Sequence, residues 1–209
     1  MKTVMCYGDS NTWGCNPANE ERFGLDVRWP GILRTTLGSD YWVVEEGLSG
    51  RTTVWDDPIE GDKNGKTQLP PILYTHRPLD LVVIMLGTND LKMRFSVPAY
   101  DIANGAGVLV DIVNKSGCGP NGSAPQVLLV APPPVATLKG FFAAIFEGAA
   151  AKSKLFAQEY ARVAQEKDCH FLDAGSVIVS REQDGIHLDA PEHGKLGRAV
   201  AAKVREILG

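Results

Sequence analysis

The sequence lacks an apolar run long enough to cross a membrane, since its uninterrupted apolar runs, such as Leu81–Leu86, are far too short. Met1 and Lys2 are followed by a strand pattern and a glycine, not by the apolar core of a signal peptide. An excess of basic residues is also missing, because the net charge is −4 and the lysines and arginines are scattered. Phosphate-tracking surfaces are basic. We therefore expect a cytoplasmic protein with neither nucleic-acid nor membrane partners.

Cysteine is scarce, and the few cysteines show no paired spacing of the kind that binds metal. They are Cys6, Cys15, Cys118 and Cys169. Neither a zinc site nor a disulfide framework is indicated, and we expect no metal and no cofactor. The chain also lacks a linker-like stretch, so we expect one domain over residues 1–209.

Short apolar runs alternate with helical patterns along the chain. Strands are predicted at 3–6, 41–44, 79–86, 127–130 and 170–172, and helices at 30–37, 69–74, 98–114, 147–167 and after 189. This alternation predicts an α/β protein, a three-layer αβα sandwich with a five-stranded parallel, flavodoxin-like sheet. An apolar segment from Val135 to Phe146 is too hydrophobic for an exposed loop, so we expect it to bury against a pocket or another subunit.

Polar residues follow the ends of three predicted strands. Gly8-Asp9-Ser10 ends the first, Gly50 lies in a turn after the second, and Gly87-Thr88-Asn89-Asp90 follows the third. Ligands and reactive groups of open α/β sheets gather at such carboxyl ends. Ser10 is therefore either a nucleophile at the sheet edge or only the N-cap of the next helix.

A histidine with a nearby aspartate offers a base for such a nucleophile. Among the four histidines, His187 alone has an aspartate, Asp184, in a compact turn three residues before it. One imidazole nitrogen could then bind Asp184 while the other faces Ser10. His76, His170 and His193 are better explained as a helix-end, a strand and a solvated helix residue.

Donors for a developing oxyanion are also available at the strand ends. They are the backbone N–H groups of Ser10 and Gly50 and the side-chain amide of Asn89, although a plain turn glycine and a plain loop amide remain the alternatives. Asp9 and Asp90 are expected to bond local backbone and support their loops.

Four short blocks, in this order, resemble those of the SGNH hydrolases, also called GDSL esterases and lipases. The blocks are Gly8-Asp9-Ser10, Gly47-Leu48-Ser49-Gly50, Gly87-Thr88-Asn89-Asp90 and Asp184-Gly185-Ile186-His187. The resemblance spans nearly the whole chain. It implies the SGNH hydrolase fold, Ser10 as nucleophile, His187 as base, Asp184 as its orienting acid, and an oxyanion hole of Ser10, Gly50 and Asn89. Asn11 departs from the family's usual leucine but removes no catalytic group.

Longer stretches are similar to a subgroup of bacterial arylesterases that also transfer acyl groups to alcohols or hydrogen peroxide. These are Glu45–Thr53, Asp56–Pro58, Met85–Asp90, Pro132–Pro134 and Phe146–Gly148. The subgroup is known for a closed octamer that restricts the entrance to each site. The resemblance therefore implies subunit contacts through the segments 138–146 and 55–66. Trp13, Phe146 and Ile186 are candidate pocket walls.

Three functions are open at this stage. The first is a serine esterase (arylesterase) that hydrolyses short-chain esters through an acyl-enzyme and also transfers the acyl group to alcohols or peroxide. The second is a carbohydrate acetylesterase of the same fold. The third is a non-catalytic flavodoxin-like module that binds a phosphate at its strand ends, although the chain has no G-x-x-x-x-G-K pattern.

Overall fold

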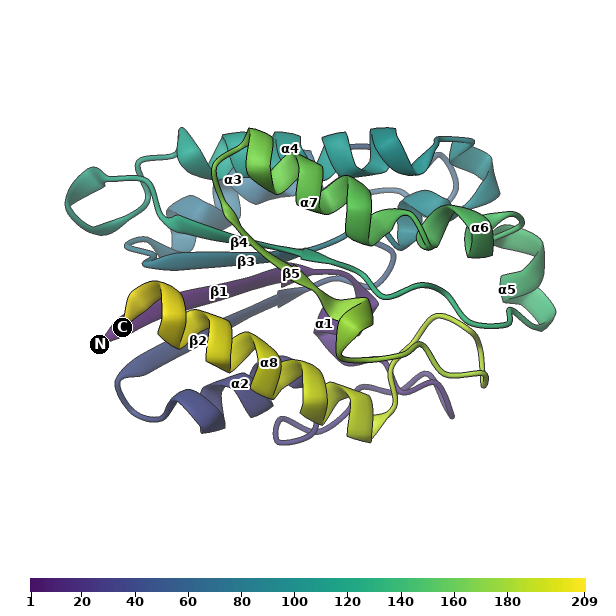
Figure 1. Ribbon diagram of the computed structural model, residues 1–209, viewed down its shortest axis with the longest axis horizontal. Helices are drawn as coiled ribbons and strands as arrows, with labels where there is room; N and C mark the ends of the chain where they lie inside the picture. The colour runs from purple at the N-terminus through teal and green to yellow at the C-terminus, as the bar shows by residue number, and fades with distance from the viewer.

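The computed structural model describes residues 1–209 and confirms the predicted five-stranded parallel sheet (Figure 1). The strands are β1 (Lys2–Gly8), β2 (Tyr41–Gly47), β3 (Leu81–Met85), β4 (Gln126–Ala131) and β5 (His170–Asp173). Their order is β2-β1-β3-β4-β5, and every pair is parallel. All residues of β3 are buried, as its continuous apolar run predicts for a strand covered on both faces.

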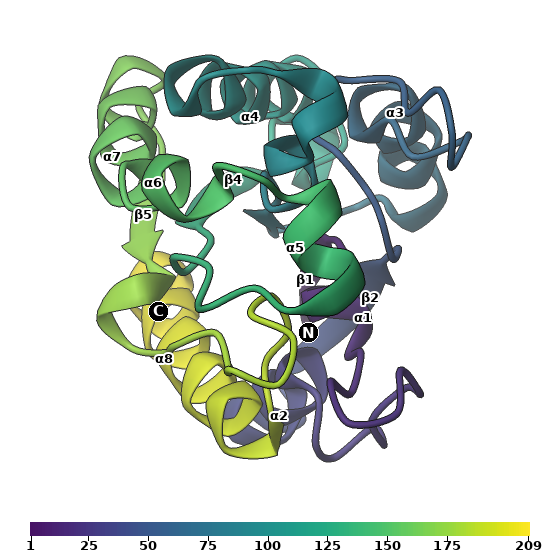
Figure 2. The same cartoon turned by 90° about the vertical axis from the view of Figure 1, so that its right-hand side faces the viewer.

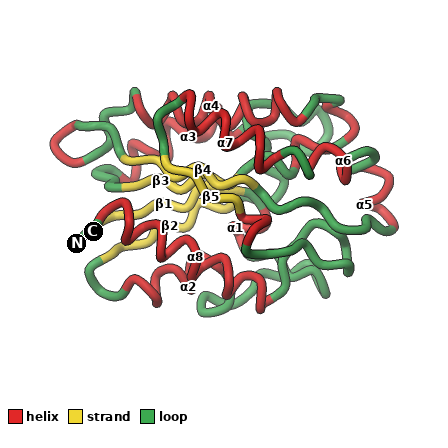
Figure 3. The backbone as a smooth tube through the Cα atoms, viewed as in Figure 1, coloured by secondary structure: helices red, strands yellow, loops and turns green.

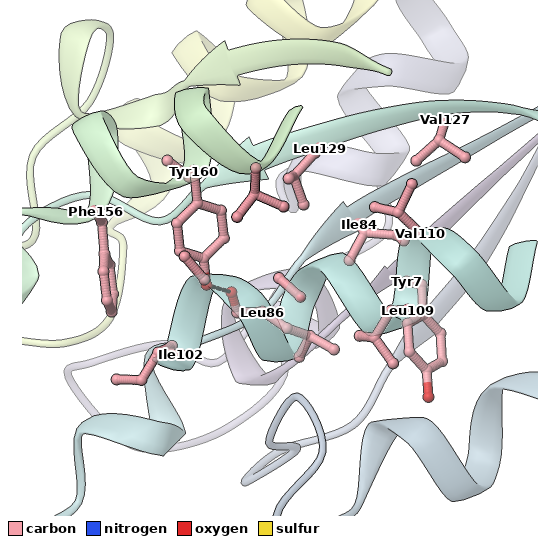
Figure 4. Packing of buried hydrophobic residues seen from close by; sticks show 14 of the residues in the cluster. Tyr7, Ile84, Leu86, Ile102, Leu109, Val110, Val127, Leu129, Phe156 and Tyr160 are labelled. Atoms are coloured by element: carbon pink, nitrogen blue, oxygen red, sulfur yellow. Dashed lines mark hydrogen bonds between the residues drawn. The ribbon is translucent and has the colours of Figure 1, made fainter. Parts of the chain in front are cut away.

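Helices cover both faces of the sheet, which gives the predicted three layers (Figures 1 and 3). One face carries α2 (Trp29–Leu37) and α8 (Ala190–Leu208), and the other carries α3 (Gly65–His76), α4 (Ala99–Asn114) and α7 (Phe156–Glu166). Apolar side chains fill the space on each side of the sheet in two separate clusters. Figure 4 shows part of the larger cluster, in which the Tyr160 hydroxyl donates to the Leu86 carbonyl at 2.7 Å.

The side of the sheet on which the chain adds its next strand switches at β1. The chain runs from β1 to β2 on one side, and then crosses to β3 on the other side of β1. The crevice outside the carboxyl end of such a strand is where ligands of open α/β sheets bind. Ser10 follows β1 at this point, in the short helix α1 (Ser10–Trp13).

The last helix carries the chain back toward β1. β5 forms the far edge of the sheet, but α8 packs beside α2, so the connection 174–189 crosses the carboxyl ends of the strands (Figure 2). The close approach of the two helices requires Gly197, because a Cβ there would lie 2.7 Å from the Ile32 side chain and 2.8 Å from the Trp29 carbonyl oxygen. This packing explains how residues far apart in sequence meet at one site.

The structure differs from the sequence expectations at one helix. The predicted helix 147–167 is broken into α6 (Ala149–Ser153) and α7, because the Ser153 hydroxyl accepts from the Val135 N–H at 3.1 Å and donates to the Ala150 carbonyl at 3.2 Å. Within the apolar segment, Gly140–Ile145 forms a further helix, α5. None of the helices has the length and apolar character required to span a bilayer.

Candidate active site

Ser10 is the first residue of α1, and Asp9 rather than Ser10 caps that helix. Asp9 accepts the Asn11 N–H at 3.0 Å, so the N-cap alternative for Ser10 is wrong. Asp9 is buried, and burial raises its pKa to about 6 against the opposing effect of the Asn11 hydrogen bond. α1 packs closely on the end of β2, where a Cβ on Gly47 would lie 2.2 Å from the Trp13 nitrogen. Because Asp9 caps the helix, the Ser10 hydroxyl is left free of hydrogen bonds to the local backbone.

Ser10, His187 and Asp184 form one continuous hydrogen-bonded chain. His187 Nε2 lies 2.9 Å from Ser10 Oγ, and His187 Nδ1 lies 2.6 Å from Asp184 Oδ2. The second carboxylate oxygen, Asp184 Oδ1, accepts the backbone N–H groups of Ile186 at 2.8 Å and His187 at 2.9 Å. All three side chains are buried. The structure thus brings together the three residues that the sequence singled out.

The negative charge of Asp184 and the positive charge of a protonated His187 stabilise each other. Burial opposes the charged form of both partners, but the surrounding hydrogen bonds and charges together outweigh it, the bond between the two side chains first among them. The pKa of Asp184 is consequently lowered. The pKa of His187 is raised, against the effect of burial, by the hydrogen bond with Asp184 and by the neighbouring Cys15 sulfur. Asp184 therefore fixes Nδ1 as the nitrogen that carries a proton, which leaves Nε2 of the neutral ring as an acceptor facing Ser10.

Asn11 ties the loop of residues 184–188, the histidine loop, to the turn that carries Ser10. Sequence reasoning missed this role. Its Nδ2 donates to the Ile186 carbonyl at 3.3 Å, and its Oδ1 accepts the Leu188 N–H at 3.1 Å. Asn11 is only 2% exposed. Its amide therefore binds the backbone on both sides of His187, and the leucine usual in the family could make neither bond.

Replacing Asn11 with alanine is expected to lower kcat about tenfold, because two buried backbone groups lose partners worth about 1 kcal/mol each. The His187–Asp184 bond lies within one loop, so the pH at which activity rises should stay unchanged. Steady-state kinetics as a function of pH would measure both values. Wild-type kcat in Asn11→Ala would contradict the positioning role.

The three proposed oxyanion donors, Ser10, Gly50 and Asn89, line one cavity together with His187. Gly50 has a φ of +84°, which its lack of a Cβ permits, and its N–H donates no hydrogen bond within the chain. Asn89 Nδ2 donates to the Arg51 carbonyl at 3.1 Å, which fixes the amide and leaves its second N–H free. Donors with unused N–H groups are what a developing oxyanion requires.

Asp90 supports the loop that carries Asn89, as expected, by tying it to a second loop. It is fully buried and accepts the Thr53 N–H at 3.0 Å as well as the Thr53 hydroxyl, so it anchors its own loop to the loop after β2. Burial raises the pKa of Asp90 to about 6, against the hydrogen bonds from Thr53. Asp90 therefore couples the loop of Asn89 to the loop of Gly50.

The cavity has a volume of about 720 Å³ and is lined by the three candidate wall residues Trp13, Phe146 and Ile186. The Phe142 ring also lines it and meets the His187 ring edge to face, with centroids 5.8 Å apart. The apolar segment thus lines a pocket, but only Val135 and Phe146 of it are buried, and Phe141 is 71% exposed. Sequence reasoning missed the other lining residues that carry charge or a thiol, which are Cys15, Glu20, Glu60, Lys92 and Arg94.

The remaining histidines lie away from Ser10. His76 ends α3 and His170 begins β5, as expected. His193 was predicted to be solvated, and this is wrong, because it is fully buried against the Phe23 ring with its Nδ1 accepting the Trp29 N–H at 3.3 Å. Burial lowers the pKa of His193 to about 4, so it is neutral.

The parallel sheet with helices on both faces defines a protein of the α/β class, and comparison with known proteins gives the family. Residues 6–193 match the model of the GDSL-like lipase/acylhydrolase family, and the chain belongs to this family. It is a carboxylic ester hydrolase. The alternative of a non-catalytic flavodoxin-like module is therefore wrong.

Solved structures resemble the chain over its whole length, and one curated protein matches part of it. An aryl esterase from M. smegmatis is 47% identical and a carbohydrate acetylesterase from Sinorhizobium meliloti is 43% identical, each with a TM-score of 0.95 and with 100% of both chains covered. An acetylxylan esterase from Xylanibacter ruminicola is 38% identical over 95 residues. That match covers 43% of this chain and only 17% of the esterase.

Proposed function

We propose that the protein is a serine esterase of the arylesterase type that hydrolyses short-chain acyl esters through a Ser10-His187-Asp184 triad. The observation that carries the proposal is the hydrogen-bonded chain from Asp184 through His187 to Ser10, with distances of 2.6 and 2.9 Å. A nucleophile, a base and a group that orients the base are the parts that acyl transfer requires.

The first half of the reaction forms an acyl-enzyme. His187 Nε2 takes the proton of Ser10 while Oγ attacks the ester carbonyl carbon, and the carbonyl oxygen becomes an oxyanion. That oxyanion accepts hydrogen bonds from the N–H groups of Ser10 and Gly50 and from the Asn89 amide. The imidazolium then gives its proton to the alcohol oxygen as the C–O bond breaks, which leaves the acyl group on Ser10.

The second half repeats these steps with a new nucleophile. Water gives its proton to His187 and attacks the acyl carbon, and Ser10 Oγ leaves with that proton. An alcohol or hydrogen peroxide in the place of water yields an ester or a peracid. The apolar cavity wall formed by Phe142, Phe146 and Ile186 supports this transfer, because a site poor in water lets another nucleophile compete.

Competition for the acyl-enzyme can be measured directly. With phenyl acetate as donor and a primary alcohol added to the buffer, we expect the phenol release rate to be maintained while acetate production falls and the alkyl acetate appears. Gas chromatography and acetate titration would quantify the two products. Acetate equal to phenol at every alcohol concentration would contradict the transferase part of the proposal and leave the esterase part standing.

We also propose that the protein forms a homo-oligomer around the cavity mouth. Two large apolar side chains there, Ile59 and Phe141, are 75% and 71% exposed. They lie in the segments 55–66 and 138–146, and burial of both in a subunit contact would remove apolar surface from water and narrow the entrance.

A carbohydrate acetylesterase is the second candidate function. The similarity to the Sinorhizobium meliloti carbohydrate acetylesterase and to part of an acetylxylan esterase favours it. The triad chemistry is identical in the two candidates, so the alcohol side of the ester distinguishes them.

A further inference from the structure

The cavity beside Ser10 has two unlike walls. One is apolar and consists mainly of aromatic and aliphatic side chains from α5 and the histidine loop, namely Phe141, Phe142, Ile145, Phe146 and Ile186. The other is charged and consists of Glu60, from the loop between β2 and α3, with Lys92 and Arg94, from the 3-10 turns after β3. A simple aryl ester such as phenyl acetate has no hydroxyl group that would donate a hydrogen bond to the charged wall.

Asp57 anchors the charged wall and has no capacity left for a ligand. Its side chain is fully buried and forms ion pairs with Arg94 at 2.8 Å and Lys92 at 3.5 Å. It also accepts the backbone N–H groups of Ile59 and Glu60 at 2.9 and 3.0 Å. These contacts more than offset burial and lower the pKa of Asp57 to about 2. The loop that carries Glu60 is thereby held at a fixed position.

Glu60 differs from Asp57 because one of its carboxylate oxygens is unused. Oε1 accepts from the buried Lys92 ammonium at 2.6 Å, whereas Oε2 has no hydrogen-bond partner in the chain. Oε2 lies close to Gly50, since a Cβ built on that glycine would be 2.7 Å away from it. The side chain is 35% exposed, so water can leave it for a ligand. A charged acceptor at the cavity therefore lies beside Gly50, whose N–H is one of the proposed oxyanion donors.

We infer that Glu60 Oε2, held by Lys92, accepts a hydrogen bond from a hydroxyl group on the alcohol portion of the substrate. The class of substrate is then a short-chain ester of a polyhydroxylated alcohol, such as an acetylated sugar, with its acyl group in the apolar part of the cavity. This inference rests on the proposed esterase function. A carboxylate beside the oxyanion site opposes the developing negative charge, and the ion pair with Lys92 reduces that cost.

The test compares two esters that share the acetyl group. Phenyl acetate has no hydroxyl group, whereas a monoacetylated methyl xyloside carries hydroxyls beside its ester. In Glu60→Ala, the ratio of kcat/KM for the xyloside to kcat/KM for phenyl acetate should fall about tenfold or more, as expected when a hydrogen bond to a charged acceptor is lost. Glu21→Ala is the matched control, because Glu21 is an exposed carboxylate that does not line the cavity. Its ratio should equal that of the wild type.

The outcomes separate this inference from the proposed function. An unchanged ratio in Glu60→Ala, an equal fall in both variants, or wild-type enzyme that cleaves phenyl acetate but not the xyloside would each overturn the inference and leave the esterase proposal standing. A wild-type protein that cleaves neither ester would contradict the esterase proposal, and the inference with it. Because both kcat/KM values are measured on the same variant, a loss of folded protein lowers the two values equally and leaves their ratio unchanged.

Discussion

Replacing Ser10 with alanine is expected to lower kcat/KM for phenyl acetate by about 10⁴-fold or more, because no other group can form the acyl-enzyme. The fold should survive, since the hydroxyl makes a single hydrogen bond, to His187 at 2.9 Å. Such a bond contributes about 1 kcal/mol to stability. Stopped-flow or plate-based phenol release would measure the activity, and thermal unfolding would measure the stability.

Ser49→Ala provides the matched control for this variant. Ser49 is another serine of the same cavity, but it is exposed and has no contact with His187. Its variant should keep activity within about twofold, in line with the small effects usual for surface changes. Turnover by Ser10→Ala at the rate of Ser49→Ala would refute the assignment of the nucleophile.

Replacing Asp184 with asparagine is expected to lower the maximal kcat/KM by about 10³ to 10⁴-fold, an effect known from serine proteases. The asparagine oxygen can still accept the two backbone N–H groups that Asp184 Oδ1 accepts, so the loop should keep its shape. Its amide nitrogen, however, faces His187 Nδ1, which must then accept. The proton moves to Nε2, and the ring can no longer take the proton of Ser10.

The pH dependence of this variant has a definite sign. His187 acts as a base only without its proton, and Asp184 raises the pKa of the ring by favouring the imidazolium. Wild-type kcat/KM should therefore rise with pH around a midpoint above the ordinary histidine value of about 6.5. In Asp184→Asn that midpoint should move to lower pH while the plateau falls. A pH profile of Asp184→Asn with the wild-type plateau and an unmoved midpoint would contradict the role of Asp184. Asn11→Ala is the reference variant, because only its kcat should change and not its midpoint.

The layers and the placement of the central residues could be predicted because local patterns determine them. Apolar runs such as Leu81–Met85 mark strands, and parallel strands bring their carboxyl ends to one edge. Ser10, Gly50 and Asn89 all follow strand ends, so a shared cavity was expected. The wrong prediction for His193 overlooked a helical spacing that the sequence shows. His193 lies three residues before Leu196 and thus on the buried face of α8.

Other features depend on contacts between segments far apart in sequence. Asn11 meets its partners across 175 and 177 residues, and Glu60 meets Lys92 across 32. Neither an apolar periodicity nor a turn residue predicts such pairs. The break between α6 and α7 has the same origin, since Ser153 bonds to the backbone of Val135, outside its own helix. Tertiary hydrogen bonds here override local helix propensity.

The most direct test of the mechanism is to find the acyl group on the enzyme. The protein is mixed with phenyl acetate, quenched in acid within milliseconds, digested, and analysed by peptide mass spectrometry. We predict one acetyl group on Ser10 in wild-type protein and none in Ser10→Ala. Acetyl on the Cys15 sulfur of the same cavity, with Ser10 unmodified while phenol is released, would contradict it.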